Sequence, residues 1–181
     1  GPYAMGDMAG LDVGWRNRKA KFDSLTPREQ KNTILDKICE MGRFGQKTGS
    51  GFYKYDEKRN ATPDPMIEEL ILKHSQEVGI PRRNITDQEI IERAIYSIIN
   101  EGAKILEEGI AARPLDIDVV WLYGYGFPVY LGGPMFYADT VGVKKVYDAI
   151  VKYKDLVGAE YWTPAPLLEK LAKEGKGFYS K

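Results

Sequence analysis

The same short pattern occurs twice in this sequence, and the repetition limits the folds that the chain can adopt. Residues 133–143 read Gly-Pro-x-x-x-Ala-Asp-x-Val-Gly-Val, and residues 1–11 read Gly-Pro-x-x-x-Gly-Asp-x-Ala-Gly-Leu. Gly-Lys-Gly-Phe-Tyr at 175–179 likewise resembles Gly-Ser-Gly-Phe-Tyr at 49–53. Because both landmarks recur in the same order at similar offsets, the sequence predicts two copies of one structural unit.

Helical periodicity accounts for most of the chain between these landmarks. Thr26-Pro27 begins a capping box, and apolar residues at helical spacing follow it as far as Gly42. A second capping signal at Thr86 precedes a long amphipathic helix that ends near Gly109. Shorter helices are expected over 114–123, from Pro134, over 143–156 and from Thr163. The predicted fold class is therefore all-α, with two related helical units.

The two copies are expected to be unequal in length. We assign residues 1–60 to a truncated first copy, 61–85 to a connector that carries a helix, and 86–181 to the second copy. Many residues, including the long helix, precede Gly133, whereas none precedes Gly1. Without leading helices the core of the first copy would be open, so we expect this chain to be the C-terminal fragment of a longer protein.

Charge and composition exclude several classes of partner. The 26 basic residues balance the 26 acidic ones, so no long-range field favours nucleic acid or anionic lipid. No apolar run is long enough for a membrane span. The single cysteine, Cys39, and the single histidine, His74, both fall in apolar helical patterns. We therefore expect packing roles for both, and no metal site.

Two basic segments raise the question of phosphate binding. The loop at 43–55 contains Lys47-Thr48, but Gln46 stands where a phosphate loop requires glycine. A tight structural turn is the preferred interpretation there. The basic run at 15–21 is either a solvated helix face or a phosphate contact, and the sequence leaves both open.

Residues 121–142 combine aromatic side chains and glycines more densely than any other stretch. Tyr123 ends a predicted helix at a Gly-x-Gly break, where a ligand can approach the backbone of Gly124 while the phenol donates a hydrogen bond. Tyr123 and Gly124 are our candidate substrate-binding residues. The alternative is that Tyr123, Tyr125 and Phe127 only pack between the two copies.

Taken together, the motifs at 1–14, 43–53, 100–109 and 123–134 resemble the duplicated C-terminal domains of L-3-hydroxyacyl-CoA dehydrogenases. Within that family the resemblance is greatest to multifunctional β-oxidation enzymes of the peroxisomal bifunctional type. It implies NAD-dependent oxidation of a (3S)-3-hydroxyacyl-CoA to the 3-ketoacyl-CoA. It also implies that NAD and the catalytic His-Glu pair belong to an upstream domain, so we expect no catalytic residue here and an inactive fragment.

The resemblance carries further expectations about site and partners. It supports Tyr123 as a substrate contact, and it places Glu92-Arg93 where the first copy's substrate-contacting Asn-Arg pair would stand. The expected partners are the chain's own upstream NAD-binding domain, an acyl-CoA and, in a homo-oligomer, another chain of the same sequence. A peroxisomal location is expected, since Ser180-Lys181 begins a peroxisomal signal; mitochondria and cytoplasm are alternatives. A purely structural or oligomerisation module is the competing function.

Overall fold

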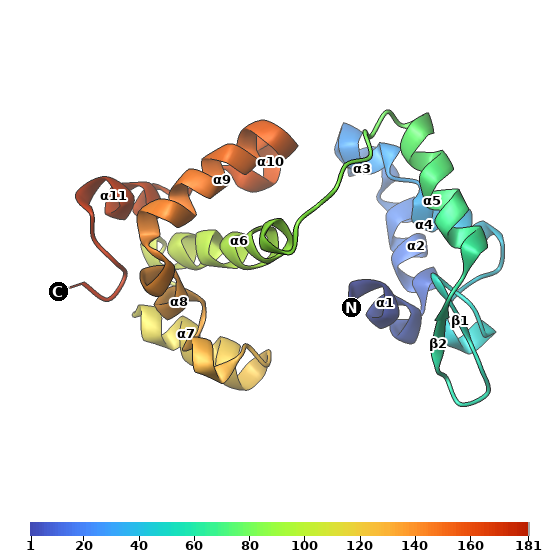
Figure 1. Cartoon of the computed structure of the whole chain (residues 1–181), viewed down its shortest axis with the longest axis horizontal. Helices are drawn as coiled ribbons and strands as arrows, with labels where there is room; N and C mark the ends of the chain where they lie inside the picture. Colours follow the sequence, from blue (N-terminus) through green and yellow to red (C-terminus); the bar gives the residue numbers. More distant parts are fainter. Residues whose placement is uncertain (181) are drawn as a thin grey trace. The chain divides into compact units, whose positions relative to one another are not determined.

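A computed structural model of the protein describes residues 1–180, which fold into two compact units. The first unit comprises residues 1–83, and the second comprises the described residues from 84 onward. Both units are built from α-helices, with one two-stranded antiparallel sheet in the first (Figure 1). The predicted all-α class is therefore confirmed.

The first unit surrounds a small core. Its elements are α1 (Pro2–Ala9), α2 (Leu11–Ala20), η1 (Phe22–Ser24), α3 (Pro27–Lys31), α4 (Ile34–Glu40), η2 (Gln46–Thr48), β1 (Tyr53–Tyr55), β2 (Ala61–Pro63) and α5 (Pro65–Glu77). Leu11, Ile38, Cys39 and Ile67 form the buried centre. Helix α5, which lies in the stretch that we assigned to a connector, packs against α4 and supplies Ile67 to this core.

The helix expected after Thr26 is interrupted, which the sequence did not reveal. The capping box itself is present, since the Thr26 side chain accepts from the Glu29 amide and the Glu29 side chain accepts from the Thr26 amide. At Gln30, however, the carbonyl accepts a hydrogen bond from the Arg18 guanidinium at 3.1 Å. The helix stops at Lys31 and restarts at Ile34. A long-range contact thus competes with helix continuation.

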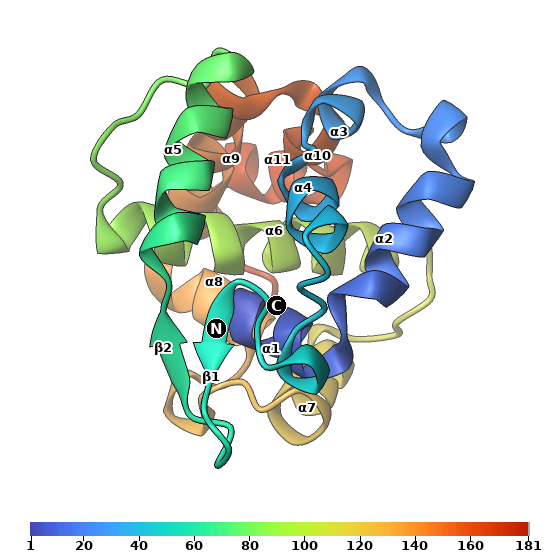
Figure 2. The same ribbon diagram turned by 90° about the vertical axis from the view of Figure 1, so that its right-hand side faces the viewer.

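The second unit is organised around one long helix. Its elements are α6 (Asp87–Glu107), α7 (Pro114–Gly124), η3 (Val129–Leu131), α8 (Pro134–Val141), α9 (Val143–Val157), α10 (Ala159–Trp162) and α11 (Pro166–Glu174). In Figures 1 and 2, α9, α10 and α11 lie on one side of α6, and α7 and α8 lie on the other. The core includes Tyr96, Ile99, Val146, Ile150 and Leu168, which are all fully buried.

The last helix begins later than its sequence signal indicated. We expected it to start at Thr163, but it starts at Pro166, after an extended segment. The buried Asn100 side chain donates to the Thr163 carbonyl at 2.9 Å and accepts from the Ala165 amide at 2.8 Å. Those two bonds fix residues 163–165 in an extended conformation that local sequence does not specify.

The two repeated sequence motifs have the same backbone geometry and the same contacts in both units. Gly10 separates α1 from α2 with φ 98° and ψ 111°, and Gly142 separates α8 from α9 with φ 100° and ψ 115°. The Asp7 carboxylate accepts from the amides of Phe52 and Tyr53, at 2.9 and 3.0 Å.

In the second unit, the Asp139 carboxylate accepts from the amides of Phe178 and Tyr179, at 2.7 and 2.9 Å. Each unit thus ties its Gly-Phe-Tyr landmark to the aspartate of its Gly-Pro helix. The repeat read in the sequence corresponds to a repeated structural motif, and duplication as its origin stays a prediction.

Candidate functional site

Helix α7 carries large apolar side chains both on the side that faces its own unit and on the side that faces away. Ile117 and Asp118 point inward and are buried. On the opposite side, Val119, Val120 and Tyr123 are exposed by 44%, 54% and 87%. A helix with large apolar residues on both sides normally has a partner on each side, so the outward residues of α7 are the strongest candidate for an interaction surface.

The exposed apolar residues continue beyond the end of α7. No charged residue occurs between positions 119 and 138. We use the name aromatic surface for the exposed residues that follow one another here: Val120, Tyr123, Tyr125, Val129 and Tyr130. A run of large exposed side chains without charge is typical of a site that binds a protein or an apolar ligand.

The aromatic residues of this segment divide between packing and exposure. The Trp121 ring lies 5.0 Å from the Tyr125 ring and 6.5 Å, edge to face, from the Phe127 ring. Phe127 is buried, whereas Tyr123 and Tyr125 project outward. Packing within the unit therefore explains why Phe127 is aromatic, but it does not explain the exposed phenol of Tyr123.

Gly124 leaves the backbone open beside Tyr123. It is the last residue of α7, and a Cβ atom added there would meet no heavy atom within 4 Å. The two predicted substrate-binding residues, which are neighbours in the sequence, thus lie at one exposed helix end. This arrangement can offer a phenol hydroxyl, an aromatic ring and accessible backbone to a ligand.

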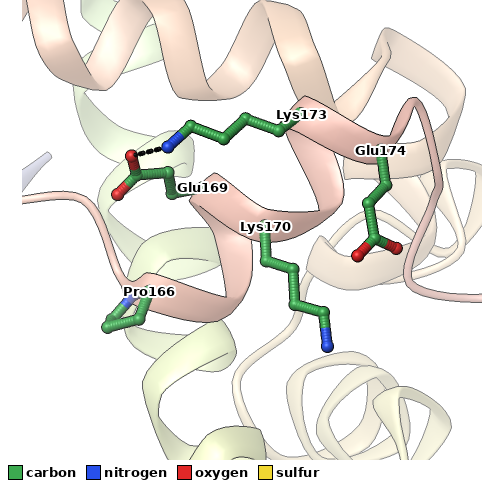
Figure 3. A pocket seen from close by; sticks show the side chains of 5 residues that line it. All are labelled: Pro166, Glu169, Lys170, Lys173 and Glu174. Carbon is green, nitrogen blue, oxygen red and sulfur yellow. Dashed lines mark hydrogen bonds and ion pairs between the residues drawn. The ribbon is translucent and has the colours of Figure 1, made fainter.

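Two hollows of the described surface lie away from Tyr123 and Gly124. One lies along α11 and is lined by Pro166, Glu169, Lys170, Lys173 and Glu174, with Glu169 and Lys173 paired at 2.5 Å (Figure 3). A smaller one is lined by Met41, Met66, Glu69, Leu70 and Lys73. Neither is lined by Tyr123 or Gly124, so the candidate site is an exposed face that needs a second surface to enclose a ligand.

The glycine-rich loop at 43–55 packs closely against α1 and α2 and does not fit a nucleotide phosphate. Lys47 forms an ion pair with Asp12, and its hydrogen bond holds the pKa of that carboxyl below the usual value. A Cβ atom at Gly45, where φ is 100°, would lie 2.1 Å from the Asp7 carbonyl oxygen. The loop is thus a tight turn, and it offers no cradle for the phosphates of NAD.

The basic run along α2 is largely paired. Arg18 contacts Asp36 at 3.0 Å, Arg16 lies 3.6 Å from Asp12, and the Lys19 ammonium lies 3.9 Å from the centre of the Trp15 ring. These contacts favour a surface helix face over a dedicated phosphate site.

Glu92 has partners inside the second unit. Its carboxylate accepts from the Tyr153 hydroxyl at 2.6 Å and from the Gln88 amide at 2.9 Å. Burial works to raise the pKa of Glu92, but these hydrogen bonds and the charges of Lys152 and Lys145 together hold the pKa below the usual value. The position that resembles the family's substrate-contacting asparagine is therefore occupied by a residue that bonds within the fold.

The lone cysteine and histidine are buried, in agreement with the packing roles predicted for them. Burial raises the pKa of Cys39 to about 11, which keeps the thiol protonated. Burial lowers the pKa of His74, and the charge of Lys37 lowers it further. Among residues 1–180, no cluster of three His, Cys, Asp or Glu side chains could hold a metal ion. Nor is any helix of this described part long and apolar enough to cross a bilayer.

Asp118, on the same helix as Tyr123, is a residue whose burial the sequence analysis did not predict. The sequence indicates only an acidic residue near a helix start, but the side chain is fully buried and faces α8. Burial raises its pKa, and the hydrogen bonds from Tyr179 and the α8 backbone oppose that rise. The one available signal was its position beside the inward-facing Ile117 in an otherwise uncharged helix face.

Fold and site together describe a small all-α protein with two helical units, the second of which exposes apolar residues along α7 and after it. The sequence profile of "3-hydroxyacyl-CoA dehydrogenase, C-terminal domain" matches residues 1–55 and 90–179. The chain therefore belongs to the family of 3-hydroxyacyl-CoA dehydrogenase C-terminal domains. Residues 56–89, which include α5, lie outside the match.

Individual relatives agree with this assignment. The chain is 46% identical to the peroxisomal bifunctional enzyme of Danio rerio and 45% identical to that of Homo sapiens. In each comparison the match covers 97% of this chain and 26% of the relative, so the chain spans about a quarter of those proteins. The crystal structure of the dehydrogenase part of multifunctional enzyme 1 from C. elegans superposes with a TM-score of 0.69 at 30% identity, over 94% of this chain and 38% of that one.

Proposed function

We propose that this chain is the helical part of an NAD-dependent 3-hydroxyacyl-CoA dehydrogenase that oxidises (3S)-3-hydroxyacyl-CoA to 3-ketoacyl-CoA in fatty acid β-oxidation. An upstream domain of the longer protein binds NAD and supplies the catalytic His-Glu pair. The present chain covers that domain and closes the acyl-CoA cleft, with Tyr123 and Gly124 against the substrate. The observation that carries the proposal is the set of exposed side chains Val119, Val120 and Tyr123 on the outward side of α7, within a stretch, 119–138, that contains no charged residue.

An apolar cover has a defined physical task in hydride transfer. Water must be excluded from the reacting carbon, and electrostatic interactions strengthen when it leaves. The aromatic surface can do this without contributing a proton-transfer group. The chain alone should therefore produce no NADH from a 3-hydroxyacyl-CoA.

A second apolar face supports an intramolecular partner. Met135 and Tyr137 of α8 are buried and half-buried, since α6 and α7 pack on that helix. The corresponding residues of α1 are Tyr3 and Met5, which are exposed by 53% and 66%. The repeated motif thus predicts that another part of the longer protein packs on α1.

The test is a single hydroxyl deletion in the longer enzyme that contains this chain. Tyr123→Phe keeps the ring and removes one hydrogen bond, so KM for the acyl-CoA should rise about 2- to 10-fold. Tyr161→Phe, which removes a hydroxyl from α10, is the matched control and should leave KM unchanged. Identical kinetics for the Tyr123 variant and the unaltered enzyme would remove Tyr123 from the site.

A purely structural or oligomerisation role is the second candidate, because Val129 and Tyr130, in the same uncharged stretch, are exposed by 76% and 87%. Aromatic residues of this kind often dominate protein interfaces. The two candidates separate on titration with acyl-CoA in the presence of the NAD-binding part. Saturable binding supports a substrate cover, whereas self-association without acyl-CoA binding supports the interface.

The proposed location is the peroxisome. It rests on the names of the relatives and on Ser180-Lys181, of which Lys181 lies outside the described residues. Mitochondria and cytoplasm remain the alternatives, and imaging of a tagged full-length protein with a native C-terminus distinguishes the three.

A further inference from the structure

The C-terminal segment of the second unit is bonded to α7, which ends in the candidate site, and to α8. From α8, Asp139 holds this segment through the amides of Phe178 and Tyr179. From α7, Asp118 accepts a hydrogen bond from the Tyr179 hydroxyl at 2.6 Å. The Tyr179 ring also contacts Phe136 edge to face, with centroids 6.1 Å apart.

Asp118 supplies the N-terminal cap that α8 lacks locally. The residue before α8 is Gly133, which has no side chain to accept a hydrogen bond. The two Asp118 oxygens instead accept from the amides of Met135 and Phe136, at 2.7 and 3.0 Å. One buried carboxylate therefore joins α7, the first turn of α8 and the C-terminal segment.

Two glycines leave the space that these carboxylate side chains occupy. A Cβ atom at Gly133, where φ is 99°, would lie 2.4 Å from the Asp118 Cβ atom. A Cβ atom at Gly177 would lie 2.3 Å from an Asp139 oxygen. Glycine is thus required at both closest approaches, and the contact leaves little room for α7 to move against α8.

This contact bears on the direction of the Tyr123 side chain. Asp118 and Tyr123 are five residues apart on α7, which places them about 140° apart around the helix axis. When Asp118 is held against α8, Tyr123 is directed outward. A small rotation of α7 would move the phenol hydroxyl away from any ligand on that face.

We propose that Asp118 and Tyr179 are positioning residues, which fix the rotation of α7 and thereby place the Tyr123 hydroxyl against the acyl-CoA. The inference rests on the proposed function, because it needs Tyr123 to contact substrate. Neither residue touches the substrate itself. Asp118 also caps α8, so Tyr179, which contributes only the third hydrogen bond, is the cleaner position to change.

The experiment is a double-mutant cycle in the longer enzyme, with KM for a 3-hydroxyacyl-CoA as the readout. Tyr179→Phe should raise KM about 2- to 5-fold through the loss of one hydrogen bond to a carboxylate. In a Tyr123→Phe background it should raise KM no further, because the hydroxyl that it positions is gone. Hydrogen exchange at Met135 and Phe136 verifies that the α8 cap persists.

Tyr55→Phe provides a matched control in the first unit, where the Tyr55 hydroxyl donates to Asp7 at 2.9 Å. It should cost comparable stability and leave KM unchanged. Two results would refute the positioning role while the proposed function stands, provided that Tyr123→Phe raises KM. In the first, Tyr179→Phe leaves KM unchanged. In the second, Tyr179→Phe raises KM by the same factor in the unaltered enzyme and in the Tyr123→Phe variant. If Tyr123→Phe itself leaves KM unchanged, Tyr123 is not a substrate contact, and the positioning role falls with it.

Discussion

Replacement of Asp7 by alanine should unfold the first unit selectively. The fully buried carboxylate accepts three hydrogen bonds, from the Phe52 amide at 2.9 Å, the Tyr53 amide at 3.0 Å and the Tyr55 hydroxyl at 2.9 Å. Each donor left without a partner costs about 1–3 kcal/mol if it stays buried. Because water can reach the partly buried donors, we expect a loss of about 3–5 kcal/mol.

This loss is large relative to the free energy of unfolding expected for the first unit. Its buried apolar core consists of Leu11, Ile38, Cys39 and Ile67. Domains of ordinary size have only about 5–15 kcal/mol of stability, so a loss of several kcal/mol should leave this unit marginal or unfolded. Asp7→Asn keeps one acceptor oxygen and should cost less than Asp7→Ala.

The assay is hydrogen exchange measured by mass spectrometry, with peptides from residues 45–55 and from the second unit followed separately. Asp139→Ala is the matched variant, since it removes the same two backbone contacts from Phe178 and Tyr179 in the second unit. Each variant should accelerate exchange in its own unit. A stability loss below about 1 kcal/mol for Asp7→Ala would refute the argument that these hydrogen bonds hold the unit together.

The remaining predictions concern two glycines and one histidine. Gly177→Ala places a Cβ atom 2.3 Å from an Asp139 oxygen, so it should destabilise the second unit by about 1–3 kcal/mol in urea unfolding. Gly124→Ala meets no neighbour and should change stability by less than about 1 kcal/mol; a larger loss would show that the backbone there is not open. His74 is buried and its pKa lies below the usual 6.5, so the folded unit favours the neutral ring. Stability of the first unit should be constant above that value and fall as the pH drops through 6.5 toward the lower pKa of the folded state. His74→Gln should remove this pH dependence, and a variant with the same dependence would assign it to another group.

Local signals in the sequence were sufficient for the class of fold and for most helices. A capping threonine, a proline in the first turn and apolar residues at helical spacing act within a few residues, so Thr26, Thr86 and Pro134 could be read directly. The paired landmarks also located the two structural motifs, because glycine at Gly10 and Gly142 is demanded by the positive φ of the backbone.

Other features depend on contacts between residues far apart in the chain. The break after Lys31 follows from Arg18 bonding to the Gln30 carbonyl, and the late start of α11 follows from Asn100 bonding to residues 163 and 165. No local propensity encodes either contact, because the competing partner lies 12 or more residues away.

For the candidate site, too, local sequence predicted one part and contacts between distant residues decided the rest. The sequence alone identified Tyr123 and Gly124, since an aromatic residue before a glycine break is a local pattern. Only the tertiary structure decided that Phe127 packs inward while Tyr123 projects, and that Asp118 is a buried tie between α7, α8 and Tyr179. The physical reason is that a carboxylate takes its role from the donors that surround it, and here those donors come from 17, 18 and 61 residues away.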